Sequence, residues 1–333
     1  MMKMTILNPG PLSTIQDEGR YGAMAGGFSP SGAMDSRAMK LANMLVGNGL
    51  ADGCIEMTMS GMTARFECDS VIAITGADMM PKLIRSTKQD AGGESLPMYH
   101  AVAVKKGDVL TMGAAKKGMR CYLAVAGGFD LPGVMGSMST NLKCTLGGFQ
   151  GRCLQAGDEL FLRRESDIAH FGPRCVKAEN DYPERIIVRV VLGPQEDYFT
   201  EKGINTFLQE EYAVSDQSDR MGVRLEGSKI ESKDGVDIIS DGIVTGSVQI
   251  PASGTPIIMM ADRQTTGGYA KIATVISVDV KKIAQARPGT RIRFQAVNVK
   301  EAVRLRRQEE AELKALENKL LRCADQGSYF AGI

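Results

Sequence analysis

Short runs of alternating apolar and polar residues, set between glycines, constrain the fold of this chain more than any other feature. In residues 185–193 one side of an extended backbone carries Ile186, Val188, Val190 and Leu192. A later run alternates Arg291 and Arg293 with Ile292 and Phe294. Residues 272–280 hold apolar or Thr side chains at every second position, Ile272, Thr274, Ile276, Val278 and Val280. Because successive side chains of a strand point to opposite faces, the pattern predicts half-buried strands and a mainly β fold.

The glycines support this prediction. There are 38 among 333 residues, an excess that indicates either disorder or many tight turns. Three segments place a tight turn directly before a strand: 106–110, 156–160 and 288–292. Such units favour an antiparallel barrel or sandwich over an open sheet. Shorter strands are predicted at 71–75, 121–126 and 256–260.

Helices are few. Residues 34–45 repeat apolar side chains at helical spacing, with Asp35 or Ser36 placed to cap the start and Gly47 to end the helix. Residues 200–209 form a second predicted helix.

The tail and the length of the chain predict the domain organisation. Residues 301–322 form the clearest helix, with a stripe of Leu313, Leu316 and Leu320. This helix either docks on its own protein or a neighbour, or serves as a hook for a specific partner. Because 333 residues suit two domains, and polar turn formers occupy 172–184, the predicted divisions are 1–178, 179–300 and a helical tail at 301–333.

Composition excludes several classes of protein. Forty Lys and Arg against 39 Asp and Glu give a net charge of +1, which disfavours nucleic acid as a partner. The seven cysteines form no C-x-x-C pair, as expected for buried thiols in a reducing cytosol. Asn8-Pro9-Gly10 interrupts the start before a signal peptide could form, and no apolar run is long enough for a membrane span. We expect a cytoplasmic protein without a membrane partner.

Histidine is nearly absent, which limits the chemistry. His100 and His170 are the only two and have no ligand-spaced neighbours, so no metal site is predicted. The phosphate-binding loop G-x-x-x-x-G-K-[ST] is also missing. Proton transfer would then depend on Asp, Glu, Lys, Tyr or Cys.

Polar residues gather in four segments. In the first, Asp17 and Arg20 form either a salt bridge in a turn or a carboxylate oriented by a guanidinium beside a substrate. The second, 26–48, contains Asp35 and Asn43, and N-capping is the structural alternative for Asp35. In the third, 218–224, two arginines are spaced to hold a carboxylate or phosphate, although surface ion pairing explains them equally well. These two are Arg220 and Arg224.

The fourth segment, 257–271, is the strongest candidate site. A buried strand leads into five polar residues and a predicted Gly-Gly turn, and then into a further strand. The candidates here are Asp262, Arg263, Gln264, Thr265, Thr266, Gly267, Gly268, Tyr269 and Lys271. Gln16 and Gln249 complete the predicted substrate-binding set.

These segments carry a family resemblance. The chain resembles the KipA-type proteins, also called allophanate hydrolase subunit 2-like or the C subunit of prokaryotic 5-oxoprolinase (PxpC), and one half of the urea carboxylase carboxyltransferase domain. The resemblance rests on GPLSTIQDEGRYG (10–22), SPSGAMDSRAMKLANMLVGN (29–48), AVAGGFDLPGVMGSMSTNLKCTLGGFQGR (124–152), SDRMGVRLEG (218–227), SDGIVTGSVQIPASGTPIIMMADRQTTGGYAKIATVISVD (240–279) and AQARPGTRIRF (284–294). The family commonly has GSRST where this chain has GSMST at 136–140, so Met138 replaces a frequent Arg. The tail beyond about residue 300 lies outside the resemblance.

The resemblance implies two cyclophilin-like β-barrel domains and an obligate KipI-like B subunit. It also implies a LamB/YcsF-like A subunit and ATP-dependent opening of 5-oxo-L-proline to L-glutamate, with the ATP-binding subunit left open. On this hypothesis Arg220 with Arg224, or Arg263, holds a substrate carboxylate. Proton transfer or amide polarisation is assigned to Asp17, Asp262, Tyr269 and Lys271. Backbone donors at Gly267-Gly268 could stabilise an anionic oxygen.

Two alternatives stay open. One is a biotin-dependent carboxyltransferase acting on a small amide, with biotin on a separate carrier because this chain has no biotinyl-lysine motif. The other is a regulatory protein that binds a KipI-like kinase inhibitor and has no need of the 262–271 cluster.

Overall fold

The computed structural model describes residues 2–87, 92–164 and 173–326, with side chains to Leu321. The chain divides into two compact units. The first contains Met1–Gly19, Asp35–Asp181 and Leu313–Ile333, and the second contains Arg20–Met34 and Tyr182–Glu312. The division predicted from sequence places residues 20–34 in the N-terminal domain and the tail in a separate segment. In the structure, residues 20–34 belong to the second unit, and the tail is divided between the two units after Glu312.

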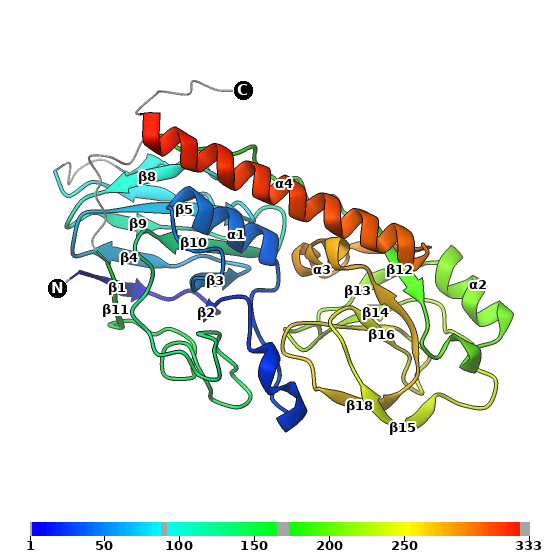
Figure 1. The fold of residues 1–333 in the computed structure, drawn as a ribbon. Helices are drawn as coiled ribbons and strands as arrows, with labels where there is room; N and C mark the ends of the chain where they lie inside the picture. Colours follow the sequence, from blue (N-terminus) through cyan, green and yellow to red (C-terminus); the bar gives the residue numbers. More distant parts are fainter. Residues whose placement is uncertain (1, 88–91, 165–172, 327–333) are drawn as a thin grey trace. The chain divides into compact units, whose positions relative to one another are not determined.

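The first unit contains two antiparallel sheets (Figure 1). The six-stranded sheet has the order β11(Glu159–Phe161), β1(Lys3–Asn8), β4(Thr63–Phe66), β9(Val109–Thr111), β6(Lys82–Ile84), β7(Glu94–Ser95). The five-stranded sheet has the order β2(Ser13–Gln16), β3(Cys54–Thr58), β10(Arg120–Val125), β5(Ser70–Gly76), β8(Ala101–Val104). Helix α1 (Ser36–Leu45) packs against β5 and β10. Strands β3, β5 and β10 are buried along their whole length, which explains why the predicted strands at 71–75 and 121–126 lack a polar face.

The second unit contains a closed seven-stranded barrel. Its order is β12(Arg185–Leu192), β19(Lys271–Val275), β16(Ser247–Gln249), β17(Ile257–Met259), β14(Gly222–Glu226), β13(Glu211–Val214), β20(Arg291–Ala296). Parallel pairing of β20 with β12 closes the barrel. Two further strands, β15 (Asp237–Gly242) and β18 (Thr266–Tyr269), pair with each other as a separate ribbon. The helical elements are η1(Tyr21–Gly26), η3(Glu196–Tyr198), α2(Glu201–Gln209), η4(Ser277–Asp279) and α3(Val280–Gln285). The mainly β prediction is confirmed.

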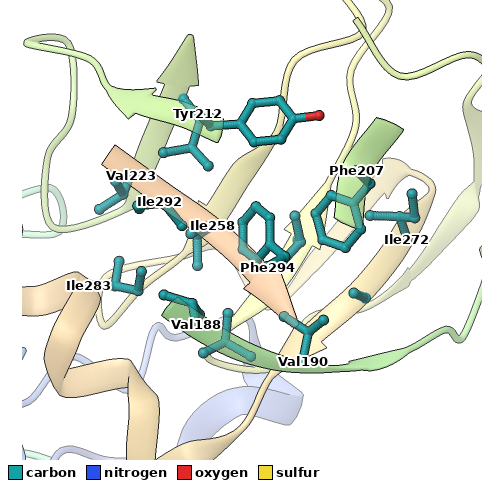
Figure 2. Close-up of a cluster of buried hydrophobic side chains, with 14 of the residues drawn as sticks. Val188, Val190, Phe207, Tyr212, Val223, Ile258, Ile272, Ile283, Ile292 and Phe294 are labelled. Atoms are coloured by element: carbon teal, nitrogen blue, oxygen red, sulfur yellow. The ribbon is translucent and has the colours of Figure 1, made fainter. Parts of the chain in front are cut away.

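The barrel core includes Val188, Val190, Ile272, Ile292 and Phe294 from the alternating runs predicted from sequence (Figure 2). Val188 and Val190 from β12 are fully buried, whereas Ile187 between them is 55% exposed. Phe294 of β20 stacks on Phe207 of α2 with ring centroids 4.3 Å apart. Period-two alternation therefore marks strands with one face on this core.

One predicted strand is shorter than expected. The pattern predicted an extended chain from Ile272 to Val280, but β19 ends at Val275 and the 3-10 helix η4 follows. The Asp279 carboxylate bonds the Arg189 backbone N–H (2.8 Å) and guanidinium (2.6 and 2.9 Å). These bonds favour the turn over a longer strand.

The C-terminal helix α4 spans Val299–Gln326. Residues up to Glu312 belong to the second unit, where Glu309 pairs with Lys281 of α3 at 2.9 Å. From Leu313 onward the helix belongs to the first unit, and its predicted leucine stripe packs on Leu41, Met44 and Tyr99. Across the described ranges, every helix is too short or too polar to cross a lipid bilayer.

Candidate functional site

The sequence-predicted site residues fall into both units. Gln16, Asp17, Asp35 and Asn43 belong to the first. Arg20, Arg220, Arg224, Gln249 and residues 262–271 belong to the second. Each group is described within its own unit.

Asp17 follows β2 and is held by the loop at 136–140. Its carboxylate accepts hydrogen bonds from the Ser137 and Ser139 hydroxyls (2.6 and 2.5 Å). The backbone N–H groups of Gly19 (2.7 Å) and Met138 (2.6 Å) also donate to it. Four donors on one buried carboxylate organise the loop. The donor from position 138 is a backbone group, so this bond does not depend on the Met138 side chain.

Gln16 lies beside Asp17 and is fully buried. Its Nε2 donates to Thr14 Oγ1 (3.0 Å) and to the Thr140 carbonyl (3.1 Å). No described residue donates to its Oε1. The side chain thus ties β2 to the same loop.

Asp35 and Asn43 support α1. Asp35 Oδ1 accepts from the Ala38 N–H at 3.0 Å, so the N-capping interpretation is confirmed. Asn43 is fully buried and donates to the Asp52 carbonyl at 2.8 Å. Both side chains have local structural partners.

Arg220 and Arg224 differ in burial. Arg220 is buried and forms a two-point contact with Asp262, Nε to Oδ2 at 2.8 Å and Nη2 to Oδ1 at 3.3 Å. It also donates to the Gly32 carbonyl at 2.7 Å. Arg224, by contrast, is an exposed residue of β14. The Arg220–Asp262 pair joins the chain before β14 to the turn after β17.

Arg263 is almost completely buried, with 2% exposure. Its guanidinium donates to the carbonyl oxygens of Ile243 (3.1 Å) and Met260 (3.4 Å). Burial lowers the pKa of Arg263. Arg20 is likewise buried in this unit, and its backbone N–H donates to Pro30 O at 2.8 Å.

The predicted Gly267-Gly268 turn is wrong, because both glycines lie inside β18. The turn comes earlier, where the Arg263 N–H donates to Met260 O at 3.3 Å. A Cβ at Gly267 would lie 2.6 Å from Ile243 Cδ1 and 3.0 Å from Gln249 Nε2. Glycine is needed here for close approach and not for a left-handed turn.

Lys271 is the centre of a polar group that we call the Lys271 cluster: Gln195, Asp241, Gln249, Gln264 and Lys271. The Lys271 side chain is only 3% exposed, and its ammonium lies 2.8 Å from Asp241 Oδ2. Within the part of the chain that the structure describes, Asp241 is the only acceptor bonded to this ammonium, which has three donors. Hydrogen bonding from Lys271, assisted by the Gly242 N–H and Gln195, lowers the pKa of Asp241 below its usual value.

Three glutamines complete this cluster. Gln195 accepts from the Lys271 N–H (3.1 Å) and donates to Asp241 (3.3 Å). Gln249 lies directly opposite Lys271 in the β16–β19 pairing, so the two side chains share a face. Gln264 lies near Gly267 with Gln249, and no described residue donates to its buried Oε1.

The remaining candidates of this segment border the cluster. The Thr265 carbonyl accepts from the Ile243 N–H at 2.9 Å, and Thr266 pairs with Gly242. Tyr269 is 41% exposed, and its carbonyl accepts from Gln249 at 3.3 Å. An ammonium and several carboxamides placed together can polarise an amide carbonyl or bind a small carboxylate.

Asp241, Gln195, Ser137 and Ser139 were missed as functional or supporting residues. Asp241 lies 30 positions from Lys271, and Ser139 lies 122 positions from Asp17. No local spacing joins such pairs. The polar character of GSMST was the one available signal for the serines. In the described ranges, no three His, Cys, Asp or Glu side chains are grouped closely enough to hold a metal ion, and His170 lies outside those ranges.

The sheets, barrel and polar loops define a carboxyltransferase-type fold, and comparison with known proteins agrees. The family model described as "Carboxyltransferase domain, subdomain A and B" matches residues 26–296. The chain belongs to this family.

Individual relatives narrow the comparison. The chain is 40% identical to the C subunit of 5-oxoprolinase from Haemophilus influenzae, covering 92% of this chain and 96% of that protein. It is 36% identical to the Escherichia coli protein of the same name, with coverage of 94% and 97%.

Solved structures extend the comparison to larger proteins. K. lactis urea amidolyase matches with a TM-score of 0.84 and 28% identity, over 94% of this chain but 20% of its own. The protein TTHA0988 matches with a TM-score of 0.77 and 31% identity, over 89% of this chain and 56% of its own. In both relatives the same fold is one part of a longer polypeptide.

Proposed function

We propose that this chain is the C subunit of an ATP-dependent 5-oxoprolinase, which opens 5-oxo-L-proline to L-glutamate. The observation that carries the proposal is the end-to-end match with two proteins that bear this name, each covered to at least 96%. The urea amidolyase match, in contrast, spans 20% of that chain. A match along the whole length favours the same role in the same kind of assembly.

The Lys271 cluster is the part of this chain best suited to the reaction. Water adds to the ring carbonyl carbon, the ring C–N bond breaks, and the nitrogen takes a proton to become the amine of glutamate. We assign the Lys271 ammonium to the oxygen that becomes negatively charged in this step. Gln249 and Gln264 are positioned to orient the amide, and half-exposed Tyr269 to contact the substrate. Asp241 then acts as a positioning residue.

The other candidate residues have supporting roles in this proposal. The carboxylate of Asp17 accepts from four donors of its own unit, and that of Asp262 accepts from two nitrogens of the Arg220 guanidinium. We therefore assign them to holding loops in place. Arg263 remains a candidate for a substrate carboxylate, although its guanidinium already donates to two backbone carbonyls.

ATP hydrolysis belongs to the complex in this proposal. The chain has no phosphate-binding loop, and we assign none of its residues to ATP. The two relatives are named as one lettered component of an enzyme, which supports a heteromer. We propose a KipI-like B subunit and a LamB/YcsF-like A subunit as its partners.

Reconstitution of the three subunits tests the function. We expect 5-oxoproline-dependent ATP hydrolysis together with glutamate formation. Lys271→Met should lower kcat about 100-fold, because one donor to a developing oxyanion is lost. Lys281→Met is the matched control: this lysine is also paired, with Glu309, but lies outside the cluster and should leave kcat unchanged. Absence of turnover, with A and B active beside another C subunit, would refute the function.

A biotin-dependent carboxyltransferase is the second candidate. It is favoured by the family match and by the TM-score of 0.84 to urea amidolyase. A biotinylated partner would co-purify with the chain and be detected with streptavidin. Lack of such a partner, together with no carboxyl transfer from carboxybiotin, would exclude it.

A further inference from the structure

The ribbon formed by β15 and β18 (237–242 and 266–269) exposes apolar side chains to an unusual degree. Ile239 is 94% exposed, which is the highest value among the exposed large hydrophobic residues of the described chain. Val244, which lies two residues after the end of β15, is 56% exposed. Single exposed apolar residues are ordinary, but an almost fully exposed isoleucine followed by a second exposed apolar residue five positions later indicates an interaction surface.

A bulge explains why Ile239 projects. Asp237 pairs with Tyr269 and Asp241 pairs with Gly267. Between these two pairs, β15 advances by four residues and β18 by only two. Ile238 packs against the barrel core. Its neighbour Ile239 therefore points away from the core, at the apex of the bulge.

The ribbon also has a free edge and a negative charge. In the described residues, β15 pairs only with β18, and Figure 1 shows the two strands together at one end of the second unit. The ribbon contains Asp237 and Asp241 and no Lys or Arg, and because Asp241 is paired with Lys271, the ribbon's negative charge is that of Asp237. An unpaired strand edge can accept an added strand from another protein.

We propose that this ribbon is the docking surface for the KipI-like subunit of the complex. That subunit would insert Ile239 into an apolar recess bordered by basic side chains that face Asp237, and would add an extended segment to the edge of β15. The inference rests on the proposed function for the existence of a partner. In TTHA0988 the fold occupies 56% of a longer chain, so in that protein it is joined to further polypeptide.

The location has a consequence for the reaction. Asp241, which holds the Lys271 ammonium, lies two positions from Ile239 on β15. Because Asp241 is itself 53% exposed, a docked subunit would cover it and fix the Lys271 cluster. Activity would then depend on the partner even though the lysine belongs to this chain.

Binding measurements with full-length chains test the proposal. Ile239→Asp should weaken the affinity for the KipI-like subunit about 30-fold in calorimetry, as expected for a central apolar anchor. Ile239→Val, which keeps an apolar side chain, should retain most of the wild-type affinity. Ile187→Asp is the matched control, since Ile187 is also exposed (55%) but lies on β12, and it should bind normally. Circular dichroism would verify that each variant is folded.

Hydrogen exchange on the wild-type complex gives an independent result. We expect new protection of the amides at 237–242 on binding. Unchanged affinity of Ile239→Asp, protection confined to other segments, or no complex with the wild-type chain would each overturn the docking surface. Turnover separates the two proposals: an active complex with a tightly bound Ile239→Asp chain refutes only the docking surface.

Discussion

The carboxylate of Asp17 accepts four hydrogen bonds, and this number predicts the effect of a substitution. Asp17→Asn replaces one acceptor oxygen by a donor, so that buried donors of the 136–140 loop lose their partner. We expect a loss of about 3 kcal/mol in the free energy of unfolding. Urea titration measures it. The neighbouring Glu18→Gln is the control, because Glu18 forms a surface ion pair with Lys40. This substitution should lower the free energy of unfolding by less than about 1 kcal/mol. Equal losses would contradict the structural role.

Asp262 allows the catalytic and structural hypotheses to be separated. Its pair with Arg220 is largely buried, with side-chain exposures of 12% and 7%. Removing one partner leaves an uncompensated charge, so Asp262→Asn or Arg220→Met should each cost about 3 kcal/mol. The variant with both substitutions should lose less stability than the sum of the two single losses. A stable Asp262→Asn protein without turnover would instead support the catalytic hypothesis, and exposed Arg224→Met serves as the control.

Residues of the site could be predicted from sequence only where the signal is local. Asp35 was recognised as a possible helix cap because capping depends on adjacent positions. Lys271 was found because it continues a polar segment, but Asp241 was not, since the exposed strand that carries it has no pattern linked to Lys271. Gly267 was misread as a turn residue. Its neighbour Ile243, which excludes a Cβ there, is distant in sequence.

At the scale of elements, strands with one face on a core were predicted well. β12 and β20 alternate clearly because their outer faces are exposed, with Arg291 and Arg293 pointing outward. The end of β19 was not predicted, since Ile276 and Val278 continue the apolar alternation after the strand has ended. Local periodicity does not reveal the hydrogen bonds from Arg189 to Asp279 that favour a turn, because the two residues are 90 positions apart.

This bond joins β12 to η4 and predicts a pH dependence. Burial alone would raise the pKa of Asp279, but hydrogen bonds from Arg189 and the nearby Lys282 ammonium outweigh it and lower the pKa below its usual value. A carboxyl whose pKa is lowered on folding stabilises the protein above its unfolded pKa, and this contribution is lost as the pH falls through the folded pKa. We therefore expect Asp279→Asn to be about 3 kcal/mol less stable than wild type at pH 6. The difference should shrink below about pH 4.

Urea unfolding of both proteins between pH 6 and 2.5 measures this difference. Exposed Asp216→Asn is the control and should follow the wild-type curve. A gap that stays constant down to pH 2.5 would show that Asp279 does not stabilise the protein through its charge.

At the scale of the whole molecule, length predicted two units but not their exact composition. Met34 packs in the core of the second unit, although α1 of the first unit begins two residues later. Tertiary contacts decide this membership, and nothing in the local sequence of 20–34 signals it. The division of α4 between Glu312 and Leu313 likewise falls within one continuous helical pattern.

The division of α4 predicts that its second half stabilises one unit selectively. Leu320 is 5% exposed and packs in the cluster of Leu41, Met44 and Tyr99. Leu320→Ala should therefore cost about 2 kcal/mol through lost burial and an unfilled cavity. Each unit has its own core, so the loss should be confined to the first.

Native-state hydrogen exchange resolves the two units. In Leu320→Ala, amides of β5 and β10 should exchange faster, while those of β12 and β20 keep wild-type protection. Leu321→Ala is the matched control, because this adjacent leucine is 54% exposed and should change neither set. Phe207→Ala, which truncates a fully buried ring of the barrel core, should produce the opposite pattern. Equal loss of protection in both units for Leu320→Ala would show that the molecule opens as a single cooperative structure, and the assignment of the helix to separate units would then have no energetic meaning.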